Sequence, residues 1–129
     1  MDKKPILTGF NKQLEEFLED IVRLFPNDKD IRAARTSLNL MKKMNPKLII
    51  NCWYEYVSKP YGGEIMEKGI EPFIDKNYKE DMKYLEESAK ILEVIDRIRT
   101  PLRELSEDDK KISSQYIINL VKLSNAYNL

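Results

Sequence analysis

The chain has 129 residues, of which 42% are hydrophobic and 34% charged, and its 22 basic and 22 acidic residues give a formal net charge of zero. This balance argues against a dedicated non-specific nucleic-acid binder, because such proteins usually carry a basic excess that drives counterion release. The chain contains no histidine, which excludes triads, zinc sites and histidine-based acid–base chemistry. The length is typical of a single domain.

Cysteine usage and hydropathy indicate where the chain is found. Its single cysteine, Cys52, cannot form an internal disulfide, which favours a reducing, intracellular location. The first five residues lack the apolar run of a signal peptide. The longest apolar stretch, residues 48–50, is far shorter than the ~20 residues that span a bilayer. We therefore expect a soluble protein that is neither secreted nor transmembrane.

Helical periodicity dominates the chain once a short polar N-terminal tail, residues 1–8, has ended. Residues 9–129 are therefore predicted to form a single helical domain. Apolar residues at a spacing of 3.6 predict a first helix over residues 10–24, with acidic side chains on its other faces.

The second and third helices are separated by short polar boundaries. Either Asn27 or Asp28 can cap the second helix, since a short side-chain oxygen accepts from its first N–H groups; this helix is predicted to end near Met44. Its apolar stripe consists of Ile31, Ala34, Leu38 and Met41. The third helix, over 46–58, is apolar around most of its circumference and is expected at the centre of the domain. Residues 59–63 contain two glycines and are predicted to form a loop.

The second half of the chain also has a helical pattern. Helical segments are predicted over residues 64–68, 78–98, 101–105 and 107–127, with a short turn at 72–74. Gly69 ends the first of these segments, Asn77 resembles a capping-box residue, and Pro101 starts the brief third segment. Ser106 is followed by three acidic residues, a strong N-terminal signature. The prediction is an all-α bundle of four long helices and two or three short ones.

Five basic residues form the first candidate site, on one side of the second helix. At about 100° per residue they spread over about 140°, and we call them the basic face: Lys29, Arg32, Arg35, Lys42 and Lys43. Arginine and lysine at this spacing suit phosphates or an acidic partner. The alternative is a solvated face that the acidic first helix neutralises.

An aromatic segment forms the second candidate site. On a helix, Trp53 and Tyr56 share one face, so Tyr54 and Tyr61 are expected to be exposed beside the glycine loop. Exposed aromatic side chains favour protein–protein contact. In the alternative interpretation, Trp53 and Tyr56 anchor the core and the other tyrosines cover its rim.

Tests for catalytic and metal chemistry fail. A calcium-loop template that starts at Asp75 meets Glu80 where glycine is required. The pair Glu15 and Glu19 lacks the second set of ligands that a di-metal site needs. No glycine-rich phosphate loop is present, and Cys52 has no evident activating neighbour. We predict no catalytic residue, no metal site and no cofactor.

Scattered positions along nearly the whole chain carry a family resemblance. They are Phe10-Asn11-Lys12-Gln13-Leu14, Phe17-Leu18-Glu19-Asp20, Phe25-Pro26, Asp30-Ile31, Ala34, Thr36-Ser37-Leu38, Lys43, Asn45-Pro46-Lys47-Leu48, Trp53, Tyr56-Val57, Phe73-Ile74-Asp75-Lys76 and Leu120-Val121-Lys122-Leu123-Ser124. The chain resembles a family of small proteins of large nucleocytoplasmic DNA viruses, including those that infect algae and amoebae. The resemblance implies no catalytic residue; it implies a viral protein in the cytoplasm of an infected host cell or in the virion.

Two functional interpretations follow. The first is a non-enzymatic interaction or structural module that binds a viral or host protein, or another copy of itself, through the basic face or the aromatic loop. The second is a nucleic-acid-associated protein that uses the basic face. No membrane partner is expected.

Overall fold

The computed structural model describes residues 2–75 and 86–129, and every element in these ranges is helical. The elements are α1 (Lys4–Leu24), α2 (Lys29–Met44), α3 (Leu48–Trp53), the π-helix η1 (Tyr54–Ser58), α4 (Lys59–Lys68), α5 (Glu71–Asp75), α6 (Glu86–Leu102) and α7 (Glu107–Tyr127). The predicted all-α bundle is confirmed, and α1, α2, α6 and α7 are the longest of the described helices.

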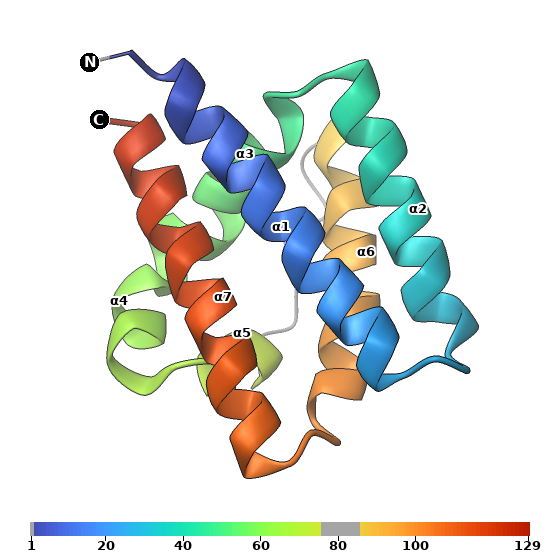
Figure 1. Cartoon of the computed structure of the whole chain (residues 1–129). Coiled ribbons are helices and arrows are strands. Elements are labelled where there is room, and N and C mark those ends of the chain that lie inside the picture. The colour runs from blue at the N-terminus through green and yellow to red at the C-terminus, as the bar shows by residue number, and fades with distance from the viewer. Residues whose placement is uncertain (1, 76–85) are drawn as a thin grey trace.

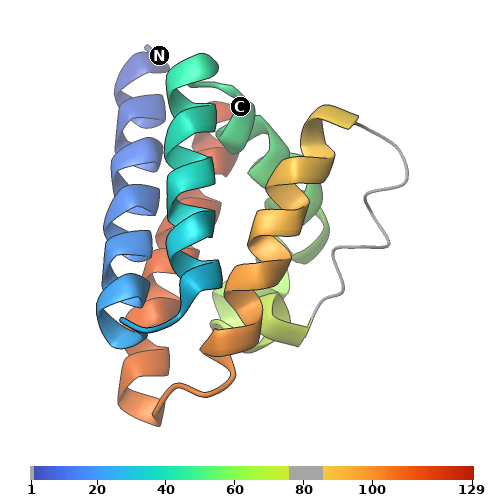
Figure 2. The same cartoon turned by 90° about the vertical axis from the view of Figure 1, so that its right-hand side faces the viewer.

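The helix α1 lies across the bundle and packs against α7 on one side and α2 on the other (Figure 1). The opposite side of α2 packs against α6, as the rotated view also shows (Figure 2). The short helix α3 contacts α1, α2, α6 and α7. The expected central position of the third helix is therefore confirmed.

Local capping chemistry sets two helix starts as predicted. The carboxylate of Asp28 accepts from the backbone N–H groups of Asp30 and Ile31, at 2.9 and 3.2 Å, so Asp28 is the cap of α2. The hydroxyl of Ser106 accepts from the N–H of Asp109 at 3.2 Å and caps α7. Each cap satisfies donors that the first helical turn leaves unpaired.

The polar tail predicted at the N-terminus is wrong from Lys4 onward, because α1 begins there. The N–H of Lys4 donates to the carboxylate of Asp2 at 3.0 Å. Pro5 suits the first turn, since its missing N–H is not needed there. Ile6 and Leu7 pack half-buried against the core, and this burial extends the helix toward the N-terminus.

The glycine loop predicted after the third helix is also wrong, because the chain there continues as α4. The N–H of Lys59 donates to the carbonyl of Tyr54, five residues back. Such a widened turn accommodates a proline such as Pro60, whose ring crowds the preceding turn. At Gly62 a Cβ atom would lie 3.2 Å from Cγ1 of Val121. This glycine therefore serves the close packing of α4 on α7 and makes no turn.

The predicted break at Pro101 does not occur, because α6 continues through it to Leu102. Pro101 removes one helical hydrogen bond only one residue before the helix ends, so the disruption is small. The N–H groups of Arg103 and Glu104 donate to carbonyls three residues back, at 3.3 and 3.0 Å, and close the last turn. The predicted start of this helix, with its Asn77 cap, lies outside the described residues.

Candidate functional site

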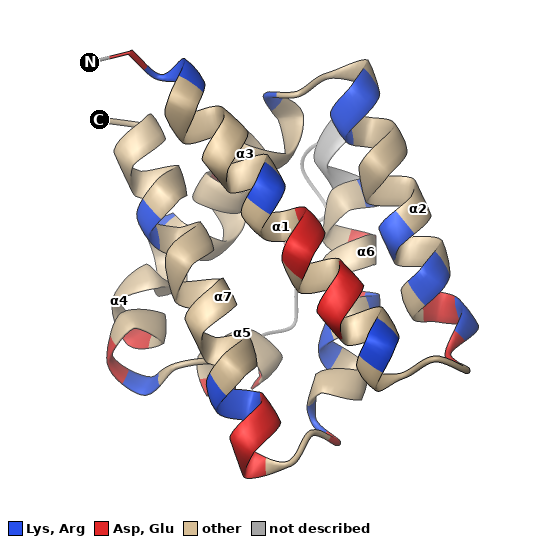
Figure 3. Cartoon of the chain, viewed as in Figure 1, with Lys and Arg blue, Asp and Glu red and all other residues tan. Residues whose placement is uncertain are grey.

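The structure divides the basic face between two environments. The guanidinium of Arg35 lies 3.3 Å from the carboxylate of Glu19, and Nζ of Lys42 lies 3.2 Å from that of Glu15. Both pairs join α2 to α1, whose acidic bands run beside the basic bands of α2 (Figure 3). Two of the five cations are therefore paired with carboxylates of α1.

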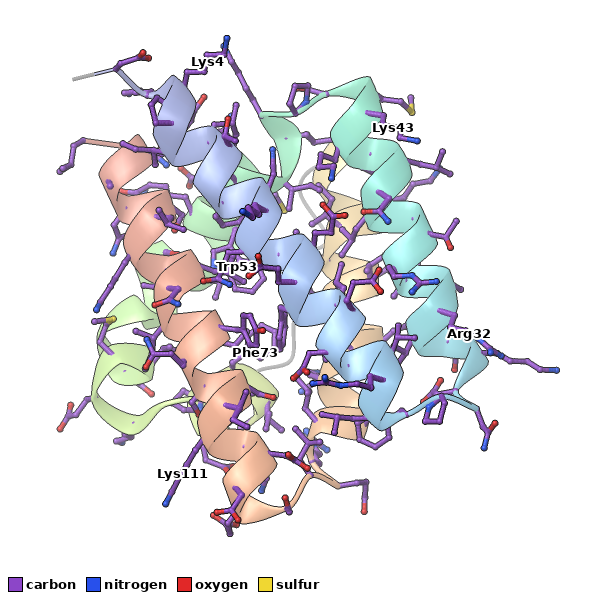
Figure 4. All side chains as sticks on the ribbon, viewed as in Figure 1. Lys4, Arg32, Lys43, Trp53, Phe73 and Lys111 are labelled. Atoms are coloured by element: carbon purple, nitrogen blue, oxygen red, sulfur yellow. The ribbon has the colours of Figure 1, made fainter. Side chains whose placement is uncertain are left out.

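The other three cations, Lys29, Arg32 and Lys43, are exposed. Arg32 donates from Nη1 to the carbonyl of Pro26 at 3.1 Å. Lys29 and Arg32 lie in the first turn of α2 and Lys43 in its last turn; Figure 4 shows Arg32 and Lys43 at opposite ends of the helix. At a rise of about 1.5 Å per residue, Arg32 and Lys43 are roughly 16 Å apart along the helix axis. They do not form a concentrated patch.

A groove of about 570 Å³ lies beside this face, between α2 and α6. We call it the α2–α6 groove, and its lining residues are Ser37, Leu40, Met41, Met44, Asn45, Leu48, Lys90, Glu93, Val94 and Arg97.

Apolar side chains are unusually exposed in the α2–α6 groove. Leu40 is 57% exposed and Met44 is 84% exposed. The other large apolar side chains that the described residues expose are scattered: Met66 on α4, Ile112 on α7 and Leu129 at the end of the chain. Contiguous exposed apolar surface marks contact sites more often than isolated residues do. Flexible methionine side chains also adapt well to a partner.

The charged wall of the groove comes from α6. Arg97 donates from Nη2 to the carboxylate of Glu93 at 2.6 Å, so these two charges neutralise each other. Lys90, one turn before Glu93, is exposed and has no ion pair with any side chain of residues 2–75 and 90–129. Among its described lining residues, the groove therefore combines exposed apolar side chains with a cation that forms no ion pair, Lys90.

The second candidate site differs from its prediction. Tyr54 lies in η1 and Tyr61 in α4, and both are half-buried. Tyr61 packs against the core. It also lines an open depression of about 310 Å³ between α4 and α5. With no loop between them, the two tyrosines are parts of a continuous helical run.

An open depression of about 650 Å³ also lies over α1 and α7, and its lining is mostly charged. The ring of Tyr116 forms one wall. Burial raises the pKa of the Tyr116 phenol above its ordinary value of 10.0, and the negative charges of Asp20 and Glu16 raise it further. The nearby Arg23 opposes this shift and is paired with Asp20. The lining of this depression carries four carboxylates and two cations, so its surface is acidic on balance.

The structure bears on the metal and cysteine predictions only within the residues that it describes. Within residues 2–75 and 86–129, no group of three potential metal-ligating side chains gathers. The calcium template falls largely on residues outside those ranges. Cys52 is buried in α3. In the same ranges, no helix has both the length and the apolar character that crossing a bilayer requires.

The sequence does contain a signal for the α2–α6 groove, outside the apolar stripe of α2. Leu40 and Met44 lie four residues apart, which places them on one side of α2. They fall outside the apolar stripe predicted to face the core. Apolar residues beside such a stripe widen it beyond what a core contact needs, and here they form the exposed edge of the groove.

No protein-family model, curated protein or solved structure matches the chain. The viral family resemblance therefore stays a prediction.

Proposed function

We propose that this chain is a non-enzymatic interaction module that binds a viral or host protein in the α2–α6 groove. The observation that carries the proposal is the exposure of Leu40 and Met44 side by side on α2. Following the family resemblance, we place this interaction in the cytoplasm of an infected cell or in the virion.

The energy available from this surface suits a specific but modest interaction. Burying a large aliphatic side chain completely yields about 1.5–3 kcal/mol. Covering the exposed parts of Leu40 and Met44 therefore supplies roughly 2–4 kcal/mol. A micromolar complex needs about 8 kcal/mol in total, so these two side chains provide a substantial share and the rest of the groove adds to it.

The nucleic-acid alternative is less well supported by the same contacts. Arg35 and Lys42 are paired with Glu19 and Glu15. The remaining cations of the basic face lie at the two ends of α2. Phosphate binding draws its affinity from many adjacent cations, and the basic face does not present its free cations side by side.

Site-specific photo-crosslinking tests the proposal. A photoreactive amino acid is placed at Leu40, and the matched control carries it at Ile112 on α7, which has a similar exposure of 53%. We expect a protease-sensitive, nuclease-resistant adduct at position 40 in the cells that produce the protein, and none at position 112. Equal crosslinking at both positions, or none at position 40, contradicts the proposal.

A further inference from the structure

One lysine lines the α2–α6 groove, and two more directly precede lining residues at the end of α2 and the start of α3. Lys90 lines the groove, and Lys43 directly precedes Met44 on α2. Lys47 directly precedes Leu48, and its N–H donates to the side-chain oxygen of Asn45, another lining residue, at 3.1 Å. All three lysines are exposed, and none forms an ion pair with a residue in the described part of the chain.

Among the side chains that the structure describes, no free carboxylate in the groove lining offsets these lysines. The acidic lining residue, Glu93, is already held by Arg97 at 2.6 Å. Lys42, on the side of α2 that faces α1, is paired with Glu15. The end of the groove around Met44 therefore presents unpaired positive charge next to exposed apolar surface.

The length of the groove matches two turns of a helix. Its α2 wall extends from Ser37 to Met44 and its α6 wall from Lys90 to Arg97. Each wall is two helical turns long, about 10 Å. Amphipathic helices that bind in grooves anchor through apolar residues at i, i+3, i+4 and i+7, which also span two turns.

We propose that the α2–α6 groove binds an amphipathic helix whose apolar face covers Leu40 and Met44 and whose flanking residues are acidic. This inference rests on the proposed function and specifies the chemistry of the partner. The apolar contacts hold the helix in the groove. Lys43, Lys47 and Lys90 orient it and select carboxylates over ammonium groups, since complementary charge gives specificity and a faster encounter.

A peptide selection tests this partner chemistry. The probe is a display library of helical peptides of about 16 residues with leucine fixed at the i, i+3, i+4 and i+7 positions. Their flanking positions vary among glutamate, glutamine and lysine. Selection against the full chain is expected to enrich glutamate at the flanks, and the enriched peptides should bind at least about tenfold more tightly than their lysine-flanked counterparts.

Charge reversal on the protein provides the matched comparison. The triple variant Lys43→Glu, Lys47→Glu, Lys90→Glu should switch the selected flanks from glutamate to lysine. The control variant Lys68→Glu, Lys111→Glu, Lys122→Glu reverses three exposed lysines on α4 and α7. It should keep the preference for glutamate, and circular dichroism establishes that both variants are folded.

The outcomes separate this inference from the proposed function. Flanks enriched equally in all three residues, enrichment of lysine, or no enriched peptide overturns the acidic helix. So does a homodimer, or an oligonucleotide complex, that Leu40→Glu abolishes. If the peptide selection fails or a homodimer forms, photo-crosslinking to a protein at position 40 would still support the interaction module. An oligonucleotide complex would overturn both proposals.

Discussion

The indole of Trp53 stacks on the ring of Phe73, with their centroids 5.6 Å apart and their planes inclined by 28°. Phe10 meets the same indole edge-on, with centroids 6.2 Å apart and planes inclined by 69°. This contact joins α1, α3 and α5 at the centre of the core, as the labelled Trp53 and Phe73 show (Figure 4). All three side chains are at most 2% exposed.

Truncation of Trp53 tests its central position. We expect Trp53→Ala to lower the free energy of unfolding by about 3–5 kcal/mol, because it leaves a large cavity and removes both aromatic contacts. Urea unfolding measures the change. The control is Ile112→Ala, at an exposed position, which should stay within about 0.5 kcal/mol of the wild type. A loss below about 1 kcal/mol for Trp53→Ala would contradict the described core.

Two glycines should respond to alanine in opposite directions. Gly69 has a φ of +78°, and a Cβ there would lie 3.0 Å from Oγ of Ser114. That hydroxyl also accepts from the N–H of Ile70 at 3.0 Å. We expect Gly69→Ala to destabilise the protein by about 1–3 kcal/mol.

Gly63 is the matched control, since it lies inside α4 and a Cβ there meets no atom within 4 Å. Gly63→Ala should stabilise the protein by about 0.5–1 kcal/mol, because alanine loses less backbone entropy in a helix. Thermal unfolding of both variants checks the prediction. The same sign of change in both would contradict the helical path of α4.

The ion pairs between α1 and α2 predict how the basic face contributes to stability. Reversing Arg35 and Lys42 to glutamate places like charges opposite Glu19 and Glu15 and should destabilise the protein by about 1 kcal/mol, since exposed pairs are individually weak. The loss should shrink at high salt. Adding Glu19→Arg and Glu15→Lys restores opposite charges and should recover the stability, as urea unfolding would show. No loss, or no recovery, would assign these pairs no energetic role.

Tyr116 predicts a dependence of stability on alkaline pH. Burial, assisted by Asp20 and Glu16, raises the pKa of its phenol in the folded chain. The unfolded chain therefore releases this proton first as the pH rises. The contribution of Tyr116 to the free energy of unfolding is fully present below a pH of about 10, and it is lost as the pH rises through the folded pKa.

Replacing Tyr116 by phenylalanine should make stability fall less steeply above a pH of about 10. Urea unfolding across an alkaline pH series measures the slopes. Glu16→Gln removes one of the two acidic neighbours, so it should lower the pKa of Tyr116. The slope of stability against pH should then lie between those of the wild type and the phenylalanine variant. An unchanged slope in Tyr116→Phe would contradict the shift.

Helix starts could be predicted where their chemistry is local. Asp28 and Ser106 cap their helices with atoms only two or three residues away. The positive φ of Gly69 likewise ends α4 where predicted. Pro60 misled the prediction because the widened turn just before it accommodates its ring, and Gly62 did so because its role depends on a distant group. Gly62 faces Val121 on α7, which lies too far along the chain for a local sequence pattern to include it.

The candidate site was predictable only in part. The cations of the basic face are recognisable on a helical wheel, but their pairing with Glu15 and Glu19 depends on how α1 and α2 pack. The α2–α6 groove also combines residues from two elements far apart in the sequence. A helical pattern predicts which side of α2 is apolar, and tertiary packing decides how much of that side stays exposed.

Partner capture measures the central claim most directly. The groove variant Leu40→Glu, Met44→Glu is compared with the control variant Met66→Glu, Ile112→Glu, which alters two exposed apolar residues away from the groove. The partner is the protein crosslinked at position 40. The account predicts that the groove variant loses at least about tenfold in affinity, or about 1.4 kcal/mol, while the control variant binds as the wild type does. Equal binding by both variants would contradict it.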